Sequence, residues 1–148
     1  MHGGLFTPRP EDVIRARIAG WCEAVRTRDV ERIAAYYAPD ILAFDAVSRL
    51  RFEGLDACRR HWRECLASDE GEMVFEVRDI AVTAGADLAF AHFLNRSGRK
   101  EADGREDTVW LRVTAGYRKL TGQWLIVHEH VSVPFDLESH EALIDLHP

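Results

Sequence analysis

Hydrophobic and polar residues alternate from Gly122 to Asp136, and this alternation predicts a β-strand with two different faces. One face carries Trp124, Ile126, His128, His130 and Ser132. The other carries Leu125, Val127, Glu129, Val131 and Val133, so it is apolar except for one carboxylate. The segment from Thr108 to Lys119 divides in the same way. We therefore expect the apolar face of this sheet to meet the protein's helices and the mixed face to meet another subunit.

The first half of the chain has the 3.6-residue period of amphipathic helices. The residues Ile14, Ile18, Trp21, Cys22 and Val25 form one apolar side of a helix that runs to about Arg28. Asp29 can cap a second, short helix with Tyr37 on its apolar side, and Pro39 ends it. A strand from Ile41 to Val47 follows, and Gly54 opens a third helix.

From Glu72 onward the period changes to two, which predicts four consecutive strands. The apolar parity changes near Arg78 and Asp79, and this change indicates a β-bulge. Helices followed by an antiparallel meander are typical of an α+β protein. We expect a cone-shaped, barrel-like fold, with three N-terminal helices packed on a strongly bent, mainly antiparallel sheet. Residues 1–148 form a single domain in this interpretation, and 134–148 form a C-terminal tail.

Composition narrows the class of partner. The 148-residue chain has a formal net charge of −6, which argues against nucleic acid and anionic membranes. It contains no apolar run long enough to cross a bilayer, and its first residues lack the pattern of a secretion signal. Cys22, Cys58 and Cys65 have no disulfide or metal-site spacing, so they are expected to be thiols in the cytoplasm.

The order of elements and several motifs resemble the nuclear transport factor 2-like superfamily, and within it the SnoaL-like and ketosteroid-isomerase-like proteins of bacteria. The motifs are Tyr37-Ala-Pro-Asp-Ile-Leu-Ala-Phe-Asp45, Gly54-Leu-Asp-Ala57, Ala86-Asp-Leu-Ala-Phe90, Trp110-Leu-Arg-Val-Thr114 and the stretch from Trp124 to Asp136. The resemblance implies a cone with a pocket for a small molecule. It does not fix the activity, because isomerases, cyclases, hydratases, epoxide hydrolases and non-catalytic association domains share this fold.

The resemblance to ketosteroid isomerases implies a role for one residue and argues against the full mechanism. Asp45 falls where those enzymes place the general base. Trp21 and Leu111 fall at about the places of the two oxyanion-hole donors, and neither can supply an acidic hydrogen bond. Steroid isomerisation is therefore not expected. The kinase association domains are also similar, but their pocket arginines are matched here by Asn95, Ala115 and Val131, so no anion pocket is expected.

Asp45 and Glu129 are the two catalytic candidates. Asp45 shares a strand face with apolar residues, so burial would raise its pKa and suit it to proton transfer. In the alternative interpretation it caps the next loop through Ser48 or pairs with Arg51. Glu129 would be the only charge on an inward face, and its alternative role is a salt bridge to Arg17 or Arg28. If the two carboxyl groups face each other, they would titrate as a coupled acid and base.

The other residues fall into two groups. The expected pocket lining comprises Trp21, Tyr37, Phe93, Asn95, Leu111, Val113, Val127 and Val131, although the aromatic members also fit a simple core. The expected dimer interface comprises Trp110, Arg112, Trp124, His128 and His130. His128 and His130 have the spacing of metal ligands, with His92 as a third, but they lie on the face assigned to the interface. No metal and no cofactor are expected.

These features predict a cytoplasmic homodimer that binds a small apolar or aromatic organic ligand. If it is an enzyme, it would carry out cofactor-free acid–base chemistry such as isomerisation, dehydration or cyclisation, with Asp45 as base and Glu129 assisting. The alternative is a non-catalytic ligand-binding or association module.

Overall fold

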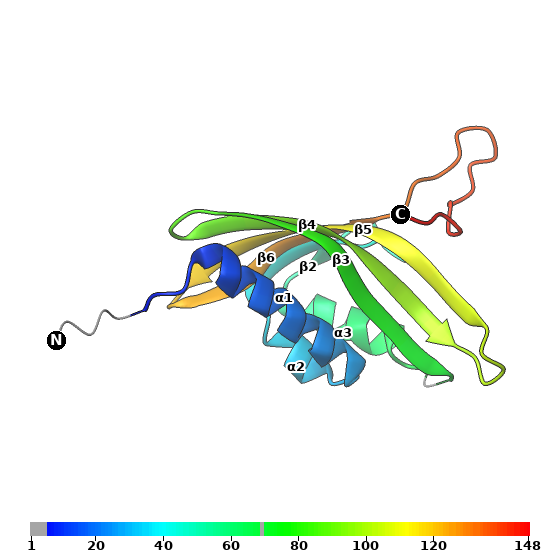
Figure 1. Cartoon of the computed structure of the whole chain (residues 1–148), viewed down its shortest axis with the longest axis horizontal. Helices are drawn as coiled ribbons and strands as arrows, with labels where there is room; N and C mark the ends of the chain where they lie inside the picture. The colour runs from blue at the N-terminus through cyan, green and yellow to red at the C-terminus, as the bar shows by residue number, and fades with distance from the viewer. Residues whose placement is uncertain (1–5, 69) are drawn as a thin grey trace.

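The computed structural model describes residues 6–68 and 70–148 as three helices and a six-stranded sheet (Figure 1). The helices are α1 (Pro10–Arg26), α2 (Val30–Ala34) and α3 (Leu55–Cys65). The strands are β1 (Tyr37–Phe44), β2 (Phe52–Glu53), β3 (Glu72–Ala84), β4 (Leu88–Lys100), β5 (Glu106–Leu120) and β6 (Gln123–Ser132). The α+β class is as predicted.

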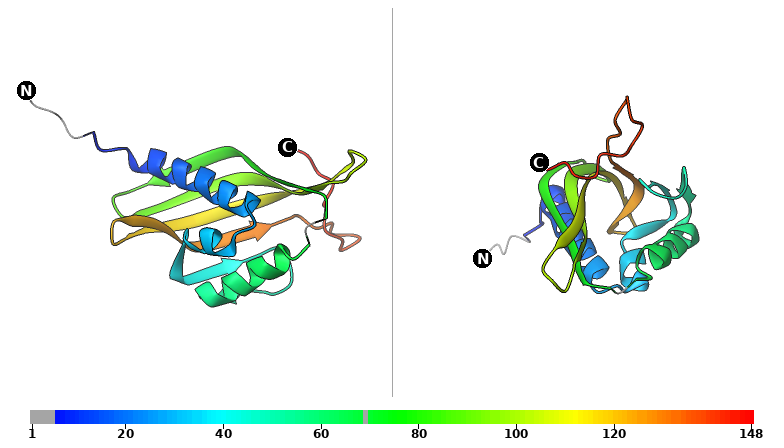
Figure 2. Two further views of the ribbon diagram at one scale, coloured as in Figure 1. Left: turned by 90° about the horizontal axis from the view of Figure 1, so that it is seen from below. Right: turned by 90° about the vertical axis from the view of Figure 1, so that its right-hand side faces the viewer.

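The sheet has the strand order β2-β1-β6-β5-β4-β3. Only the β1–β6 pair is parallel, so the described sheet is mixed but mainly antiparallel. Figure 2 shows the sheet arching over the helices, which lie together on its concave side. This curvature leaves space between the helices and the long strands β3 to β5, where the site described below is found.

Helix α1 begins and packs as its sequence predicts. Pro10 stands at the first helical position, where its missing N–H is no loss, and Glu11 and Asp12 lie in the first turn. The buried side of this helix comprises Ile14, Ile18, Trp21, Cys22, Ala24 and Val25. It packs on the concave face of the sheet, where Phe75, Phe93 and Tyr117 are also buried.

Two local predictions are confirmed by the backbone. The Asp29 side chain accepts hydrogen bonds from the N–H groups of Glu31 and Arg32 at 3.1 and 3.2 Å, so it caps α2. The pairing of β3 with β4 shifts between Arg78 and Ala81, and Asp79 has a φ of 57°. The parity change in the sequence therefore does mark a bulge.

The prediction that Tyr37 belongs to the second helix is wrong. Helix α2 ends at Ala34, and strand β1 already begins at Tyr37. Pro39 lies within β1, between Tyr37 and Leu42, where the pairing with β6 shifts register. A proline is tolerated at such an irregular position because its missing N–H interrupts no regular ladder. Tyr37 consequently reaches the interior from the sheet.

The predicted faces of β6 are wrong for its first half. Trp124 and Ile126 are 4% and 2% exposed and belong to the core, so Trp124 is not available to a dimer interface. The reason is a second bulge, because Tyr117 pairs with Ile126 whereas Gly116 pairs with His128, which leaves Val127 as an extra residue. The bulge reverses the parity, so that Trp124 and Ile126 before it and Glu129 and Val131 after it all lie on the concave side.

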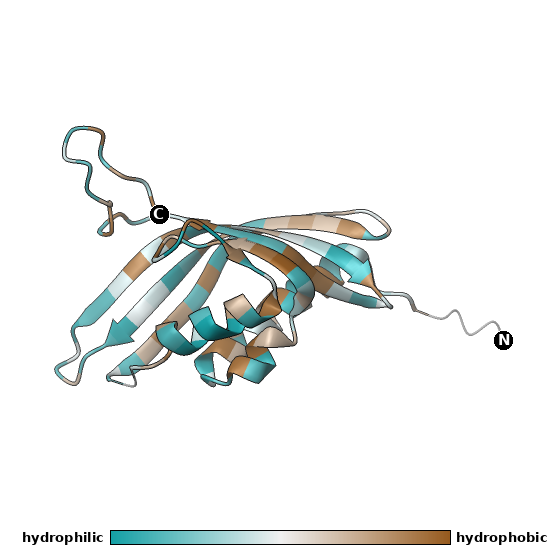
Figure 3. Ribbon diagram, turned by 180° about the vertical axis from the view of Figure 1, so that it is seen from behind, coloured by the Kyte–Doolittle hydropathy of each residue, from teal (hydrophilic) through white to brown (hydrophobic). Residues whose placement is uncertain are grey.

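The C-terminal tail extends away from the sheet as a loop (Figure 1). It folds back on itself through a bridge between Phe135 and Ala142. Figure 3 shows hydrophobic segments along it, and its exposed large side chains are Phe135, Leu137, Ile144 and Leu146. Among the described residues, no helix is both long enough and apolar enough to span a membrane.

Candidate functional site

A cavity of about 250 Å³ lies between α1, α3 and the concave face of the sheet. Its lining is Trp21, Asp45, Ala46, Val47, Trp62, Cys65, Phe75, Asn95, Ser97, Val109, Leu111, Val113, Glu129 and Val131. Most of these side chains are apolar, and the only acidic residues in this lining are Asp45 and Glu129. A smaller recess opens beside Asp45 and Glu129 and is also bordered by Tyr37, Cys58, His61 and Trp62.

The Tyr37 hydroxyl is the centre of a buried hydrogen-bond network. It accepts the indole N–H of Trp21 at 3.1 Å and that of Trp62 at 3.3 Å. It donates its own proton to Oε2 of Glu129 at 3.0 Å. A hydroxyl has one donor and two acceptor sites, so Tyr37 has none left for a ligand. Its role is to hold Glu129 and the two indoles in place.

Glu129 combines a buried position with a neutral hydrogen-bond donor. Desolvation raises its pKa to about 7, and the bond from Tyr37 opposes this rise without cancelling it. The nearby Asp45 charge raises the pKa further, while the His61 charge lowers it. Near neutral pH this carboxyl group therefore exists in both protonation states, which suits a group that gives or takes a proton.

Asp45 follows β1 and has a cationic partner instead. Its Oδ2 lies against Nε2 of His61 in α3, and its Oδ1 accepts the N–H of Ala46 at 2.6 Å. The hydrogen bond to Asp45 is the main cause that raises the pKa of His61 to about 10. His61 is therefore an imidazolium at neutral pH.

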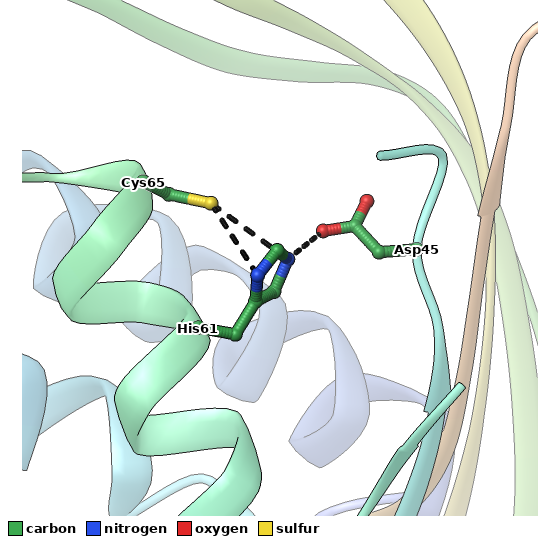
Figure 4. Close-up of side chains that lie close together, drawn as sticks. All are labelled: Asp45, His61 and Cys65. Atoms are coloured by element: carbon green, nitrogen blue, oxygen red, sulfur yellow. Dashed lines mark hydrogen bonds and ion pairs between the residues drawn. The ribbon is translucent and has the colours of Figure 1, made fainter. Parts of the chain in front are cut away.

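His61 is fixed from two further sides. Its ring stacks on Phe52 with 4.0 Å between centroids and 23° between planes. Sγ of Cys65, one helical turn along α3, lies 3.7 Å from Nε2 and 3.9 Å from Nδ1. Figure 4 shows Asp45 and Cys65 approaching the ring from different elements. Among the described residues, these three form the one cluster of potential metal ligands, with all donor atoms within 4.8 Å.

The comparisons with known proteins agree with this fold. The SnoaL-like domain matches residues 14–136. The chain belongs to the SnoaL-like domain family. No curated protein matches this chain. A solved NTF2-like protein of unknown function from Pseudomonas putida KT2440 is 47% identical, with a TM-score of 0.87 over 93% of this chain and 96% of that one.

Two more distant structures share the fold of this SnoaL-like protein. A ketosteroid isomerase-like protein from Erwinia carotovora atroseptica is 19% identical, with a TM-score of 0.68 over 85% of this chain and 97% of that one. A proposed dehydratase of the NTF2-like family from Streptomyces avermitilis is 16% identical, with a TM-score of 0.70 over 82% and 93%. At such low identity the similarity establishes the fold alone.

The structure brings most of the predicted pocket residues to the cavity. Asp45 and Glu129 both face it, and so do Trp21, Asn95, Leu111, Val113 and Val131. Tyr37 borders the smaller recess. Phe93 packs against Trp21 in the core and does not line the cavity, and Val127 lies at the bulge outside the lining.

The alternative partners considered for the two acids are not the observed ones. Glu129 bonds to Tyr37 rather than to Arg17 or Arg28. Asp45 pairs with His61, and Arg51 instead pairs with Glu53 at 3.1 Å.

On the outer face, Arg112 and His130 are exposed, Trp110 and His128 are partly buried, and His128 Nδ1 lies 2.7 Å from the Leu42 carbonyl oxygen.

The sequence interpretation missed His61 and Cys65 as site residues, although it considered Trp62 as an aromatic residue that could stack on a ligand. The helical period gave a signal for His61, because it lies three residues after the buried Cys58 and four before Cys65 in α3. No local signal shows that this side of α3 faces Asp45, because that contact depends on how the helix crosses the end of β1.

Proposed function

We propose that this SnoaL-like protein is a cofactor-free acid–base enzyme that isomerises, dehydrates or cyclises a small, mainly apolar organic molecule. The observation that carries the proposal is the presence of two carboxyl groups, Asp45 and Glu129, on one apolar cavity with different partners. An acid and a base that act on one substrate need such different environments.

The surroundings of Asp45 and Glu129 indicate which of them acts as the base and which as the acid. Asp45 is held as a carboxylate by the His61 imidazolium, so it is the group that removes a proton from carbon. Glu129, with a pKa of about 7, supplies a proton to an oxygen of the substrate from its carboxylic acid form. In a dehydration, Asp45 takes the α-proton while Glu129 protonates the departing hydroxyl group, which leaves as water. In an isomerisation, the same two transfers give an enol; Asp45 then returns its proton to a second carbon and the enol oxygen returns its proton to Glu129, so that the double bond moves.

The cavity walls indicate the class of substrate. Trp21, Trp62, Phe75, Leu111 and Val113 offer flat and apolar surfaces. A cavity of about 250 Å³ is at the small end of ligand sites. A cavity of this size fits a small cyclic or aromatic ketone better than a steroid.

The proposal is tested by proton exchange at carbon, which does not require the natural substrate. A panel of small cyclic ketones and β-hydroxyketones is incubated with the protein in D2O, and deuterium uptake at the α-carbon is followed by NMR. We expect uptake with the unchanged protein and a loss of at least about tenfold in Asp45→Asn and Glu129→Gln, as for a removed acid–base group. Glu138→Gln, a change in the tail far from the cavity, is the matched control.

Two results would contradict this function. One is the absence of exchange with every ketone that binds in the cavity, which would favour a non-catalytic ligand-binding module. The other is equal exchange in the unchanged protein and in both carboxyl variants.

We also propose that the protein is a cytoplasmic homodimer formed through the outer face of the sheet. Phe90 is 49% and Leu88 57% exposed there, and Arg112 and His130 lie on the same face. Aromatic residues together with arginine are typical of protein–protein interfaces. A second copy of the chain would cover this surface on both molecules at once.

A further inference from the structure

The Asp45–His61–Cys65 cluster includes a thiol, that of Cys65, which the proposed acid–base catalysis does not use. Its three side chains offer an oxygen, a nitrogen and a sulfur from one place beside the cavity (Figure 4). We propose that Asp45, His61 and Cys65 form a site for a divalent transition-metal ion of the zinc type. The proposal does not rest on the acid–base function.

The sulfur of Cys65 and the ring nitrogen of His61 have the separation that such an ion requires, while the Asp45 oxygen lies closer to the ring than a shared ion would allow. Tetrahedral zinc with its usual bond lengths to nitrogen and sulfur places these two ligand atoms roughly 3.5 Å apart. Sγ of Cys65 lies 3.7 Å from Nε2 of His61. The carboxylate oxygen of Asp45 is in direct contact with the same Nε2, and all three atoms fit within 4.8 Å. An ion would enter by moving Asp45 slightly away from the ring.

The positions of the ligands come from rigid parts of the fold. His61 and Cys65 are four residues apart in α3, so their side chains lie one turn apart on the same side of the helix. Phe52 stacks on the imidazole, and the Ala46 N–H holds the second oxygen of Asp45. Contacts of this kind orient metal ligands and raise metal affinity.

The charges balance at this site. A carboxylate, a thiolate and a neutral imidazole carry two negative charges, which cancel those of a divalent ion. Metal binding requires the deprotonated forms of these ligands, so it releases protons to solvent. A neutral complex suits the His61 side chain, which is only 9% exposed, while the exposed Cys65 leaves the site open to ions from solvent.

Three protein ligands leave one coordination position open, as in catalytic rather than structural zinc sites. Asp45 and Cys65 both line the cavity, so the open position would face any ligand bound there. The metal-loaded protein could then polarise an oxygen of the ligand but could not use Asp45 as a base. Metal-free and metal-loaded forms would therefore differ in their chemistry.

Cobalt(II) is the probe, because its absorption reports both geometry and sulfur ligation. The reduced, chelator-treated protein is titrated with Co²⁺ and then with Zn²⁺ as competitor. We expect one equivalent of Co²⁺ to give visible bands of tetrahedral cobalt and a near-ultraviolet thiolate charge-transfer band, and Zn²⁺ to abolish both. Cys65→Ser should remove the charge-transfer band. Asp45→Asn should weaken Co²⁺ binding at least about tenfold, as for loss of one ligand.

Cys58→Ser is the matched control, since Cys58 is a buried thiol on the same helix and outside the cluster. Circular dichroism checks that each variant is folded. The proposal is overturned if the unchanged protein gives no bands, if they survive Cys65→Ser, or if they depend on Cys58. Loss of the bands in His130→Ala would also overturn it, by moving the site to the outer face. The titration needs no substrate, so its failure would leave the acid–base function standing, and the reverse is also true.

Discussion

Asp45 and Glu129 are both carboxyl groups on the wall of one cavity, but they are held in opposite ways. Asp45 lies against the imidazolium of His61, so its charge is matched by another charge. Glu129 receives a hydrogen bond from the neutral Tyr37 hydroxyl in a desolvated position, and its pKa rises to about 7. Desolvation, which the Tyr37 hydrogen bond only partly offsets, is therefore what lets the Glu129 carboxyl group carry a proton near neutral pH.

Removing the Tyr37 hydroxyl should have the largest effect. Tyr37→Phe leaves the Trp21 and Trp62 indoles and the Glu129 carboxyl group without their shared partner. We expect the free energy of unfolding to fall by about 3–5 kcal/mol, since each unmade buried hydrogen bond costs about 1–3 kcal/mol. Urea denaturation measures this loss. The control is Tyr36→Phe, which removes a neighbouring hydroxyl outside the network, and an equal loss in both variants would contradict the role of Tyr37.

Glu129→Gln should change how stability depends on pH. The pKa of Glu129 is higher in the folded protein than the ordinary 4.5, so ionisation opposes folding. The stability of the unchanged protein should therefore fall as pH rises from about 4.5 to about 7. The variant should lack this fall and gain on the order of 3 kcal/mol at pH 8. Urea denaturation over this range is the measurement, and an unchanged profile in the variant would show that Glu129 is not desolvated.

Asp45→Asn should remove the ion pair between Asp45 and His61, in contrast to the neutral hydrogen bond that holds Glu129. His61 has a pKa of about 10 because of Asp45, so the stability from this pair is complete below pH 6.5 and is lost as pH rises through 10. In the variant the His61 pKa should fall towards 6.5, and the protein should lose about 2 kcal/mol at pH 7. NMR titration of the imidazole measures the pKa. A value that stays near 10 would mean that Asp45 is not its main partner.

His130→Glu should leave both carboxyl groups unchanged and affect only assembly. The residue is exposed on the outer face, and a second copy would place the new acid in the contact. We expect a dimer with the unchanged protein and about tenfold weaker association in the variant, roughly the effect of 1.4 kcal/mol. Sedimentation at micromolar concentration is the test. A monomer in both cases would exclude the outer face as an interface.

The fold could be predicted from the sequence wherever a pattern repeats often enough. The apolar side of α1 and the bulge near Asp79 follow from several residues that agree with one another. The bulge at Val127 could not be predicted, because the residues before it on both faces are apolar, so neither parity is excluded. The buried face of a strand can be inferred from alternation only where polar residues mark the exposed face, and the segment from Trp124 to Val127 contains no charged or hydroxyl side chain.

The candidate site was predictable only in part, for a different reason. Asp45 and Glu129 stand out because each is an acid among apolar neighbours on a strand. Their partners Tyr37 and His61 could not be assigned, because one was placed in the wrong element and the other depends on a contact between α3 and the segment after β1. Distances across the fold are set by how elements pack, which local patterns do not report.

The extra residue at Val127 also affects which insertions and deletions this strand can accept. Without a bulge, a strand of the same length would turn His128 and His130 to the concave side and Glu129 away from it. Loss of Val127 alone would straighten the ladder while every other side chain kept its side. Loss of Glu129 would bring His130 to the concave side and exchange an acidic wall for a basic one in a single step. Relatives that differ in length here should therefore differ in ligand.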